Sequence, residues 1–549
     1  MKLHHLRPLW GLLVGACLLP ACHQQYSTES LVVTEAPEQA AAPGETPAPA
    51  AAEPPRENRE SYAVIHENPF LTAARNPLST FAIDVDRASY ANVRRFLTQD
   101  RQLPPPDAVR LEELVNYFPY QYPQPRSGPA SLNAEVAACP WNPAHQLVLV
   151  GVQGKQVAAE SLPPANLVFL IDVSGSMDEP QKLPLLKESL RLLVREALRP
   201  QDYVAIVVYA GAAGVVLPPT SGAEPKTILH ALDQLQAGGS TAGGAGLRLA
   251  YELARQHRRP GSNNRIILAT DGDFNVGEQS DADMERLITR ERESGVFLSV
   301  LGFGAGNLQD SKMELLADQG NGNYAYIDQL QEARRVLVQQ FGGTLFTLAR
   351  DVKVQVEFNP ALVREYRLLG YENRLLAAED FNDDRKDAGE LGAGQQVTAL
   401  YEVVPAGAPP TGNTSVDALK YQTTAPTRTA NTGAELLTVK LRYQEPAGGP
   451  SQLLSLPVRG VRLGEPIAGA SDNLRWAAAV AQFGLLLRRS RYAGTATWAS
   501  TATLARHTQA PDADGSRREF QQLVQEAAML AGGREGGPSP TGVLTGPER

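Results

Sequence analysis

The middle of the chain carries four short runs of nearly continuous apolar residues, a pattern typical of buried strands. A strand that is covered on both faces, as in a parallel sheet, has no polar side to its sequence. Segments with helical periodicity separate these runs, and this alternation predicts a doubly wound α/β domain with a mostly parallel sheet over residues 165–345. The predicted strands are Leu167–Val173, Asp202–Ala210, Arg265–Asp271 and Val296–Gly304. The predicted helices are Leu183–Ala197, Pro225–Leu235, Ala245–His257, Asp281–Ser294 and Ser311–Gln319, with another beginning near Gln329.

The regions on either side of this domain contain alternating apolar runs and further helical stretches. The N-terminal flanking region (61–164) has predicted strands at Leu78–Val85, Leu132–Cys139 and Gln146–Val152, and helices at Ala88–Thr98 and Pro106–Tyr117. A β-rich region (346–465) has predicted strands at 352–358, 397–404, 436–443 and 453–460, and a C-terminal helical region (466–535) has helices at Asp472–Tyr492 and Ser516–Leu530. We hypothesise that the strands on both sides form one sandwich into which the α/β domain is inserted. A structure in which Leu132–Val152 is unpaired with the strands after Ala349 would contradict this hypothesis.

The first 22 residues have the pattern of a targeting segment. Basic residues precede an apolar run, Leu9–Leu19, that is too short to span a bilayer, which takes about 20 apolar residues. The run ends in Leu-Pro-Ala-Cys at 19–22, which resembles the bacterial lipobox, where cleavage leaves a Cys that is then acylated. We therefore expect residues 1–22 to be a lipoprotein signal peptide and Cys22 to carry the lipid anchor. A second lipobox ending at Cys17 and a plain secretory signal are the alternatives.

A spacer follows the predicted signal. Residues 23–60 are dominated by Ala, Pro, Glu and Thr, which cannot bury a core and favour extended conformations. Residues 405–435 predict a flexible loop, and the tail 536–549 predicts disorder. An anchor at Cys22 would place the remaining chain in a bacterial cell envelope, facing the periplasm or the cell surface. His23 stands where an Asp would favour inner-membrane retention, so we prefer the outer membrane.

Composition and charge narrow the classes of function. The 549 residues include 51 Lys and Arg against 60 Asp and Glu, a formal net charge of -9. This balance argues against nucleic acid as the main partner, because phosphate binding needs a basic face. Three Cys residues are too few for a disulfide framework, and with two of them in the signal segment we expect Cys139 to be a buried thiol. The eight His residues show no zinc spacing.

Oxygen-bearing side chains gather where two predicted strands end and where a glycine-rich turn leads into a helix. Asp172, Ser174 and Ser176 close the first strand, Asp271 closes the third, and Thr241 follows the turn. In a doubly wound sheet these positions share the carboxyl edge, where ligands bind. Two carboxylates and three hydroxyls with no nearby His or Cys suit a hard cation, so we expect Mg²⁺ or Mn²⁺. With only two charged ligands, the site leaves a coordination position for a carboxylate from a partner.

At these five residues the sequence resembles the von Willebrand factor type A domain and its metal-ion-dependent adhesion site. The family pattern is Asp-x-Ser-x-Ser, then a distant Thr and a distant Asp, and the resemblance covers about Ala165–Gly343. It implies a Rossmann-like fold in which the two serines coordinate the metal directly and Thr241 can join them. It also implies that Asp172 and Asp271 bind the metal directly or through water, and that the partner is a protein presenting an Asp or Glu carboxylate.

The flanks resemble one group of bacterial lipoproteins that carry this domain between two regions of uncharacterised role. The resemblance covers nearly the whole chain after the signal, and it implies architecture more than activity. The matching stretches are ENPF, PLSTFAIDVDRASYANVRRFL and LPPPDAVRLEELVNYFPYQYP before the domain, and YRLLGYENR, EDFNDD and LRWAAAVAQFGLLLRRSRY after it.

Three other sequence motifs give weaker indications of function. Asp84 and Asp86 resemble the nucleophile motif of haloacid-dehalogenase-type phosphatases, but Ala88 stands where that motif has Thr, so we interpret them as capping and turn residues. Gly238–Gly246 lacks the Lys-Ser/Thr pair of a phosphate loop, which argues against nucleotide binding. Leu474–Tyr492 predicts a packed helix whose closing arginines suit its C-terminal end, with contact to a partner or lipid head group as the alternative.

We therefore interpret the chain as a lipid-anchored, extracytoplasmic binding protein, and not an enzyme, that engages a partner carboxylate through a divalent cation. One rival is a cation-dependent hydrolase in the periplasm or at the cell surface. It would need a general base beside the metal, for which Asp273 is the only clear candidate. The other rival is a metal-independent scaffold in the envelope. Chelation and the variant Asp172→Ala would separate these readings.

Overall fold

The computed structural model describes residues 59–239, 243–259, 261–272, 281–340, 346–386, 388–411, 435–446, 448–460 and 466–535. The predicted signal peptide with Cys22, nearly all of the spacer, most of the loop 405–435 and the tail 536–549 lie outside the described residues. No helix in the described ranges combines the length and the apolar character needed to cross a bilayer.

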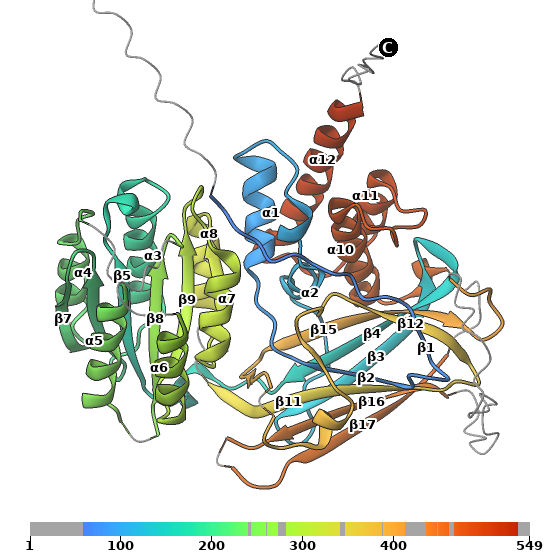
Figure 1. Cartoon of the computed structure of the whole chain (residues 1–549), viewed down its shortest axis with the longest axis horizontal. Helices are drawn as coiled ribbons and strands as arrows, with labels where there is room; N and C mark the ends of the chain where they lie inside the picture. The colour runs from blue at the N-terminus through green and yellow to red at the C-terminus, as the bar shows by residue number, and fades with distance from the viewer. Residues whose placement is uncertain are drawn as a thin grey trace, which may run out of the picture. The chain divides into compact units, whose positions relative to one another are not determined.

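A six-stranded sheet forms the centre of the α/β domain (Figure 1). Its order is β10-β9-β8-β5-β6-β7, and every neighbouring pair is parallel except β6 and β7. The mostly parallel, doubly wound sheet predicted from the apolar runs is therefore confirmed. The strands are β5 (Ala165–Asp172), β6 (Tyr203–Tyr209), β7 (Ala213–Ser221), β8 (Asn263–Thr270), β9 (Phe297–Phe303) and β10 (Tyr324–Ile327).

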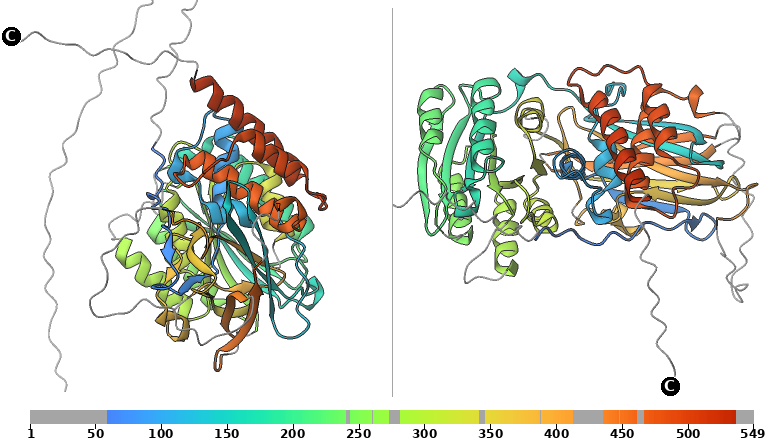
Figure 2. Two further views of the ribbon diagram at one scale, coloured as in Figure 1. Left: turned by 90° about the vertical axis from the view of Figure 1, so that its right-hand side faces the viewer. Right: turned by 90° about the horizontal axis from the view of Figure 1, so that it is seen from above.

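Helices cover both faces of this sheet (Figure 1 and Figure 2). Successive residues of β5 point to opposite faces, so that Phe169 packs in one apolar cluster and Leu170 in the other. The first cluster includes α3 (Leu183–Glu196), α4 (Pro225–Asp233) and α8 (Leu330–Arg334). The second includes α5 (Gly243–Gln256), α6 (Asp281–Glu293) and α7 (Asp310–Gln319). This two-sided burial is what requires the strands to be apolar along their whole length.

The flanking regions form a sandwich of two sheets. One sheet has the order β1-β12-β15-β4-β3 and the other β13-β2-β11-β16-β17, with β14 paired to β11. Their facing sides share one apolar core, to which β4 contributes Val150 and β11 contributes Val354. The first sheet comprises β1 (Leu71–Thr72), β3 (Ala130–Cys139), β4 (Asn142–Gly154), β12 (Val363–Leu369) and β15 (Gln396–Pro405). The second comprises β2 (Leu78–Ala82), β11 (Thr347–Phe358), β13 (Leu375–Leu376), β16 (Glu435–Gln444) and β17 (Gln452–Arg459), and β14 is Leu391–Gly392.

This pairing confirms the hypothesis of one sandwich with an inserted domain. β4, which precedes the α/β domain, pairs with β15, which follows it, in a register that places Leu149 opposite Leu400. β2 and β11 pair across the same insertion, with Phe81 opposite Val354. Each sheet therefore contains strands from both sides of the α/β domain.

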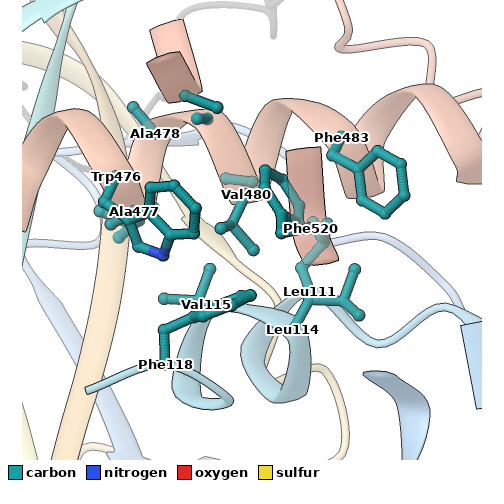
Figure 3. Packing of buried hydrophobic residues seen from close by; sticks show 14 of the residues in the cluster. Leu111, Leu114, Val115, Phe118, Trp476, Ala477, Ala478, Val480, Phe483 and Phe520 are labelled. Carbon is teal, nitrogen blue, oxygen red and sulfur yellow. The ribbon is translucent and has the colours of Figure 1, made fainter. Parts of the chain in front are cut away.

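Helices from both flanks cover the outer face of the first sheet. α1 (Ala88–Thr98), α2 (Leu111–Asn116), α10 (Asp472–Arg488), α11 (Trp498–Arg506) and α12 (Ser516–Glu535) share one apolar cluster. Figure 3 shows Leu111 and Leu114 of α2 lying against Val480 of α10. A Cβ at Gly484 would overlap the Leu111 side chain, so this glycine permits the close approach of α10 to α2. The packed helix predicted over 474–492 is confirmed, and it ends at Arg488.

Two local expectations were wrong. The helix predicted over Pro106–Tyr117 is a short 3-10 turn, η1 (Pro106–Ala108), followed by α2, because Val109 and Arg110 adopt extended backbone angles between them. Asp86 does not cap α1. Its carboxylate accepts from the backbone N–H of Tyr324 at 2.7 Å, whereas the N–H of Ser89 in the first turn of α1 donates to Glu113 at 2.8 Å.

Ion pairs between buried or partly buried side chains connect the α/β domain to the flanks, and we call this set of contacts the junction. Arg94 of α1 reaches Asp328 at 2.5 Å and Glu332 of α8 at 2.8 Å, and all three side chains are buried. Arg374, after β12, lies 3.2 Å from Asp86 and 2.6 Å from Asp318 of α7. The inserted domain is thus held by charged contacts as well as by its two covalent connections.

Candidate metal centre

Asp172 and Asp271 lie at the same edge of the α/β sheet. Asp172 is the last residue of β5, and Asp271 follows directly after β8. Because β5 and β8 are neighbouring parallel strands, their carboxyl ends meet at one edge. Both carboxylates are fully buried beneath the loops of that edge.

The turn after β5 holds the first three predicted ligands together. The backbone N–H of Ser174 donates to Asp172 Oδ1 at 2.9 Å, and the Oγ atoms of Ser174 and Ser176 are 3.1 Å apart. Asp172 Oδ2 accepts from the hydroxyl of Tyr209 at 3.1 Å and from that of Thr270 at 3.3 Å. Ser174 is buried and Ser176 is exposed, so the two hydroxyls connect the buried carboxylate to the surface.

Asp172 lacks a positively charged partner among the described residues. Burial raises its pKa to about 6, because the hydrogen bonds from Ser174 and Tyr209 only partly offset the loss of hydration and the nearby charge of Asp271 works against ionisation. A buried carboxylate beside two hydroxyls is a donor set that fits a hard cation. No group of three or more His, Cys, Asp and Glu residues in the described ranges is arranged to hold a metal, so any such site depends on hydroxyl ligands.

Asp271 has a different surrounding from Asp172, because a lysine faces it. The buried Nζ of Lys182, just before α3, lies 3.0 Å from Asp271 Oδ2 and 3.4 Å from Asn307 Oδ1. Burial alone would raise the pKa of Asp271, but hydrogen bonding with Asn307 and the charge of Lys182 lower it overall. The ammonium group of Lys182 therefore already neutralises one of the two carboxylates. Sequence reasoning missed this residue, because a single Lys between Gln181 and Leu183 belongs to no motif.

The remaining candidates from the sequence lie outside the described residues. These are Thr241, the fifth predicted ligand, and Asp273, the candidate base. The glycine turn that leads to Thr241 is nevertheless bonded to the ligand loop. Gly238 N–H donates to Val173 O at 2.8 Å, and Gly175 N–H donates to Gly239 O at 3.1 Å. The structure thus brings together four predicted ligands and the approach to the fifth.

The first described residues support the loop behind this edge. Arg59 N–H donates to Gly306 O at 2.7 Å, and the N–H of Gly306 donates to Glu60 Oε1 at 2.8 Å. The other Glu60 oxygen accepts from Arg95 of α1 at 2.8 Å. Asn307, which contacts Lys182, is the next residue of the same loop.

Comparison with known proteins agrees with this architecture. A family model described as von Willebrand factor type A domain matches residues 166–340, and one described as von Willebrand factor matches residues 56–149. A third, described as Uncharacterized protein YfbK, C-terminal, matches residues 343–530. The chain is 45% identical over 474 residues to Uncharacterized protein YfbK of Escherichia coli (strain K12), covering 85% of this chain and 80% of that protein. The chain belongs to the YfbK family.

More distant relatives share shorter segments with this YfbK-family chain. Inter-alpha-trypsin inhibitor heavy chain H3 of Pongo abelii is 28% identical over 265 residues, which is 45% of this chain and 30% of that protein. A solved structure, von Willebrand factor type A from Catenulispora acidiphila, is 18% identical and covers 74% of this chain and 99% of its own, with a TM-score of 0.38. A TM-score this low does not establish a shared fold. The assignment of the type A fold is based on the family model and the order of the strands in the sheet.

Membership of the YfbK family settles the domain content of the chain. It contains a von Willebrand factor type A domain followed by the YfbK C-terminal region. The presence of a type A domain supports a protein-interaction module. The relative from Escherichia coli is itself described as uncharacterised, so membership assigns no activity, partner or metal.

Proposed function

We propose that this protein is a membrane-anchored, extracytoplasmic binding module that engages a protein partner through a divalent cation. Asp172, Ser174, Ser176, Thr241 and Asp271 would hold Mg²⁺ or Mn²⁺, directly or through water. The observation that carries the proposal is the buried Asp172 carboxylate, which has no cationic partner in the described ranges and lies below two hydroxyls 3.1 Å apart. Oxygen donors of this kind suit a hard cation.

A bound cation would supply a positive charge with a coordination position open to solvent. The chain's own residues set the strength and direction of that interaction. Asp172 is oriented by Ser174 and Tyr209, and the exposed Ser176 faces the side from which a partner approaches. Lys182 offsets the charge of Asp271, so the site attracts a cation less strongly than two unpaired carboxylates would. A partner carboxylate would then complete the coordination.

Metal binding tests the first part of this proposal. Isothermal titration of the protein with MgCl₂ and MnCl₂ should show one binding event that is lost in Asp172→Ala. The matched control is Asp283→Ala, which removes an exposed carboxylate from α6 of the same domain and should bind as the wild type does. Equal binding by both variants, or no binding by the wild type, would contradict the proposed site.

Partner capture tests the second part. Crosslinking and co-purification from native membranes in Mg²⁺ should recover a partner that is lost in EDTA and in Asp172→Ala, but retained in Asp283→Ala. Recovery that is equal in EDTA and Mg²⁺ would favour the metal-independent scaffold. Turnover of a substrate that is lost in Asp172→Ala would favour the rival hydrolase over the binding role proposed here.

The proposed anchor at Cys22 rests on the lipobox-like residues 19–22. Acyl chains stabilise membrane attachment by about 0.8 kcal/mol per buried methylene, so two or three chains hold a protein firmly. The variant Cys22→Ser should move the protein from the membrane fraction to the soluble fraction, and Cys17→Ser serves as the matched control. Retention of Cys22→Ser in membranes, or loss of Cys17→Ser, would contradict the assignment.

A further inference from the structure

A cavity of about 400 Å³ lies where the α/β domain and the sandwich meet the helical layer, by which we mean α1, α2, α10, α11 and α12. It borders the start of β10, at Tyr324, and so lies toward the edge of the sheet opposite to Asp172 and Asp271. The volume is within the range of about 300–1,000 Å³ that is typical of small-molecule sites. The residues that line the cavity include Val85, Arg87, Phe118, Arg335 and Val336.

Two arginines line this cavity without a matching pair of carboxylates. Arg87 precedes α1, and its side chain makes no hydrogen bond or ion pair with any part of the chain that the structure describes. Burial, and next the nearby charge of Arg335, lower the pKa of Arg87 to about 10. Arg335 is 7% exposed, and its Nη1 has no hydrogen-bond partner. An unsatisfied buried donor costs about 1–3 kcal/mol, more when charged, so the arrangement favours an added acceptor.

The remaining contacts of Arg335 fix its guanidinium in place. Its Nη2 donates to the carbonyl oxygen of Tyr117, and its guanidinium carbon lies 3.3 Å from the centroid of the Tyr117 ring. Tyr117 is itself stacked on Tyr90, with centroids 3.7 Å apart. The positive charge at Nη1 is therefore held on a rigid aromatic support.

The carboxylates nearest to the two arginines are already engaged by other groups. Asp86 accepts from Tyr324 N–H and pairs with Arg374. Glu332 pairs with Arg94 and accepts from the Tyr117 hydroxyl. Asp514 accepts from both the N–H and the hydroxyl of Ser516. These carboxylates reduce the local positive charge, but none forms an ion pair with Arg87 or Arg335 in the described ranges.

We propose that this cavity binds a small organic anion whose carboxylate or phosphate group pairs with Arg87 and Arg335. Planar guanidinium groups bind such oxyanions through paired N–H donors, and two of them together match a doubly negative head group. The cavity also exposes apolar side chains of Val85, Phe118 and Val336. The body of the ligand is therefore apolar or aromatic, and its volume exceeds that of an inorganic ion.

Binding of three small aromatic probes at constant ionic strength tests this proposal on the intact chain in EDTA. The probes are phenyl phosphate, benzoate and uncharged benzyl alcohol, measured by isothermal titration and by thermal unfolding. We expect at least one anion to bind with a dissociation constant of about 1 mM or tighter, a usual strength for a ligand of this size, and benzyl alcohol to bind at least tenfold more weakly. The anion that binds more tightly identifies the head group as phosphate or carboxylate.

The variant Arg87→Gln separates binding from a structural role. It should weaken anion binding by about tenfold or more, yet leave the thermal midpoint without ligand unchanged or higher, because it relieves the repulsion between two like charges. The matched control Arg385→Gln, at a fully exposed arginine, should behave as the wild type. Absence of binding by both anions, equal binding by Arg87→Gln, or equal binding of benzyl alcohol would overturn the proposal. None of these results depends on the metal site, since all are measured in EDTA.

Discussion

The junction and the candidate metal centre both contain buried carboxylates, but different groups compensate their negative charge. At the junction, Arg94 faces Asp328 and Glu332, and Arg374 faces Asp86 and Asp318. At the candidate metal centre, Lys182 faces Asp271. Among the described residues, Asp172 accepts hydrogen bonds only from hydroxyl and amide groups.

This difference separates a structural contact from a binding site. Buried carboxylates that meet a guanidinium with good geometry are satisfied by the chain itself, and they hold two regions in one arrangement. Under the proposed function, an added cation would supply the positive charge that the buried Asp172 carboxylate lacks among the described residues. We therefore expect the junction to control the stability of the fold and the candidate metal centre to control cation binding.

Loss of Arg94 is the strongest way to test the structural half of this comparison. The variant Arg94→Ala leaves Asp328 and Glu332 buried without their partner, and breaking such a pair costs about 3–5 kcal/mol. Urea unfolding followed by circular dichroism measures the loss, with the exposed Arg385→Ala as the control. A loss below about 1 kcal/mol would show that the junction does not hold the regions together.

The junction should also make stability depend on pH. Burial, and then the charge of Asp84, raise the pKa of Asp318 from 3.8 to about 7. The folded chain therefore keeps a proton that the unfolded chain releases above about pH 4, so the free energy of unfolding falls as pH rises from about 4 to 7. We expect Asp318→Asn to remove roughly 1–2 kcal/mol of that decline, a discounted value for a partly exposed side chain. Unfolding curves at several pH values measure this change, and a pH dependence identical to that of the wild type would contradict the raised pKa of Asp318.

Removal of the Lys182 charge tests whether the candidate metal centre controls cation binding. The variant Lys182→Met takes a positive charge from beside Asp271 and keeps most of the side-chain volume. Mg²⁺ affinity should rise about tenfold, which corresponds to about 1.4 kcal/mol. Isothermal titration with MgCl₂ measures the change. An unchanged or weaker affinity would mean that Lys182 does not oppose the cation.

Two surface ion pairs of one arginine in the same domain are expected to give the smallest effect. Arg191 of α3 lies 2.5 Å from both Glu188 and Asp233, at the protein surface. Exposed pairs of this kind contribute about 0–1 kcal/mol, so Arg191→Ala should change the free energy of unfolding by no more than about 0.5 kcal/mol. A larger loss in urea unfolding would mean that close charges stabilise this protein even where water screens them.

The α/β sheet could be predicted from sequence because its strands are buried on both faces. Residues such as Phe169 and Leu170 face opposite apolar clusters, which leaves no polar side to obscure the pattern. β12 was missed for the opposite reason. Glu365 and Arg367 interrupt its apolar pattern, although both are buried, and Arg367 pairs with Glu402 of β15 at 2.9 Å. A periodicity argument treats charged positions as exposed, so it fails where charges are paired inside.

The gathering of the candidate ligands at one edge could be predicted because their spacing follows from the fold. Asp172, Ser174 and Asp271 are short distances from strand ends, and the strand ends converge on one edge. Lys182 and the two cavity arginines could not be predicted in this way. The partners of Lys182 and Arg335 are Asp271 and Tyr117, which are distant in the sequence, and Arg87 has no hydrogen-bond or ion-pair partner among the described side chains. A single cation in a sequence does not indicate which groups it will face in the fold.

The hold of Arg59 and Glu60 on Gly306 has a mechanical consequence. Tension along the preceding chain would load the contacts with Gly306 and the ion pair with Arg95 of α1 before it reached the sandwich. The loop under load is the one whose Asn307 contacts Lys182, which in turn contacts Asp271. A pull on the N-terminal segment is thus delivered within a few bonds of the candidate metal centre, and the salt link from Glu60 to Arg95 shares that force with α1.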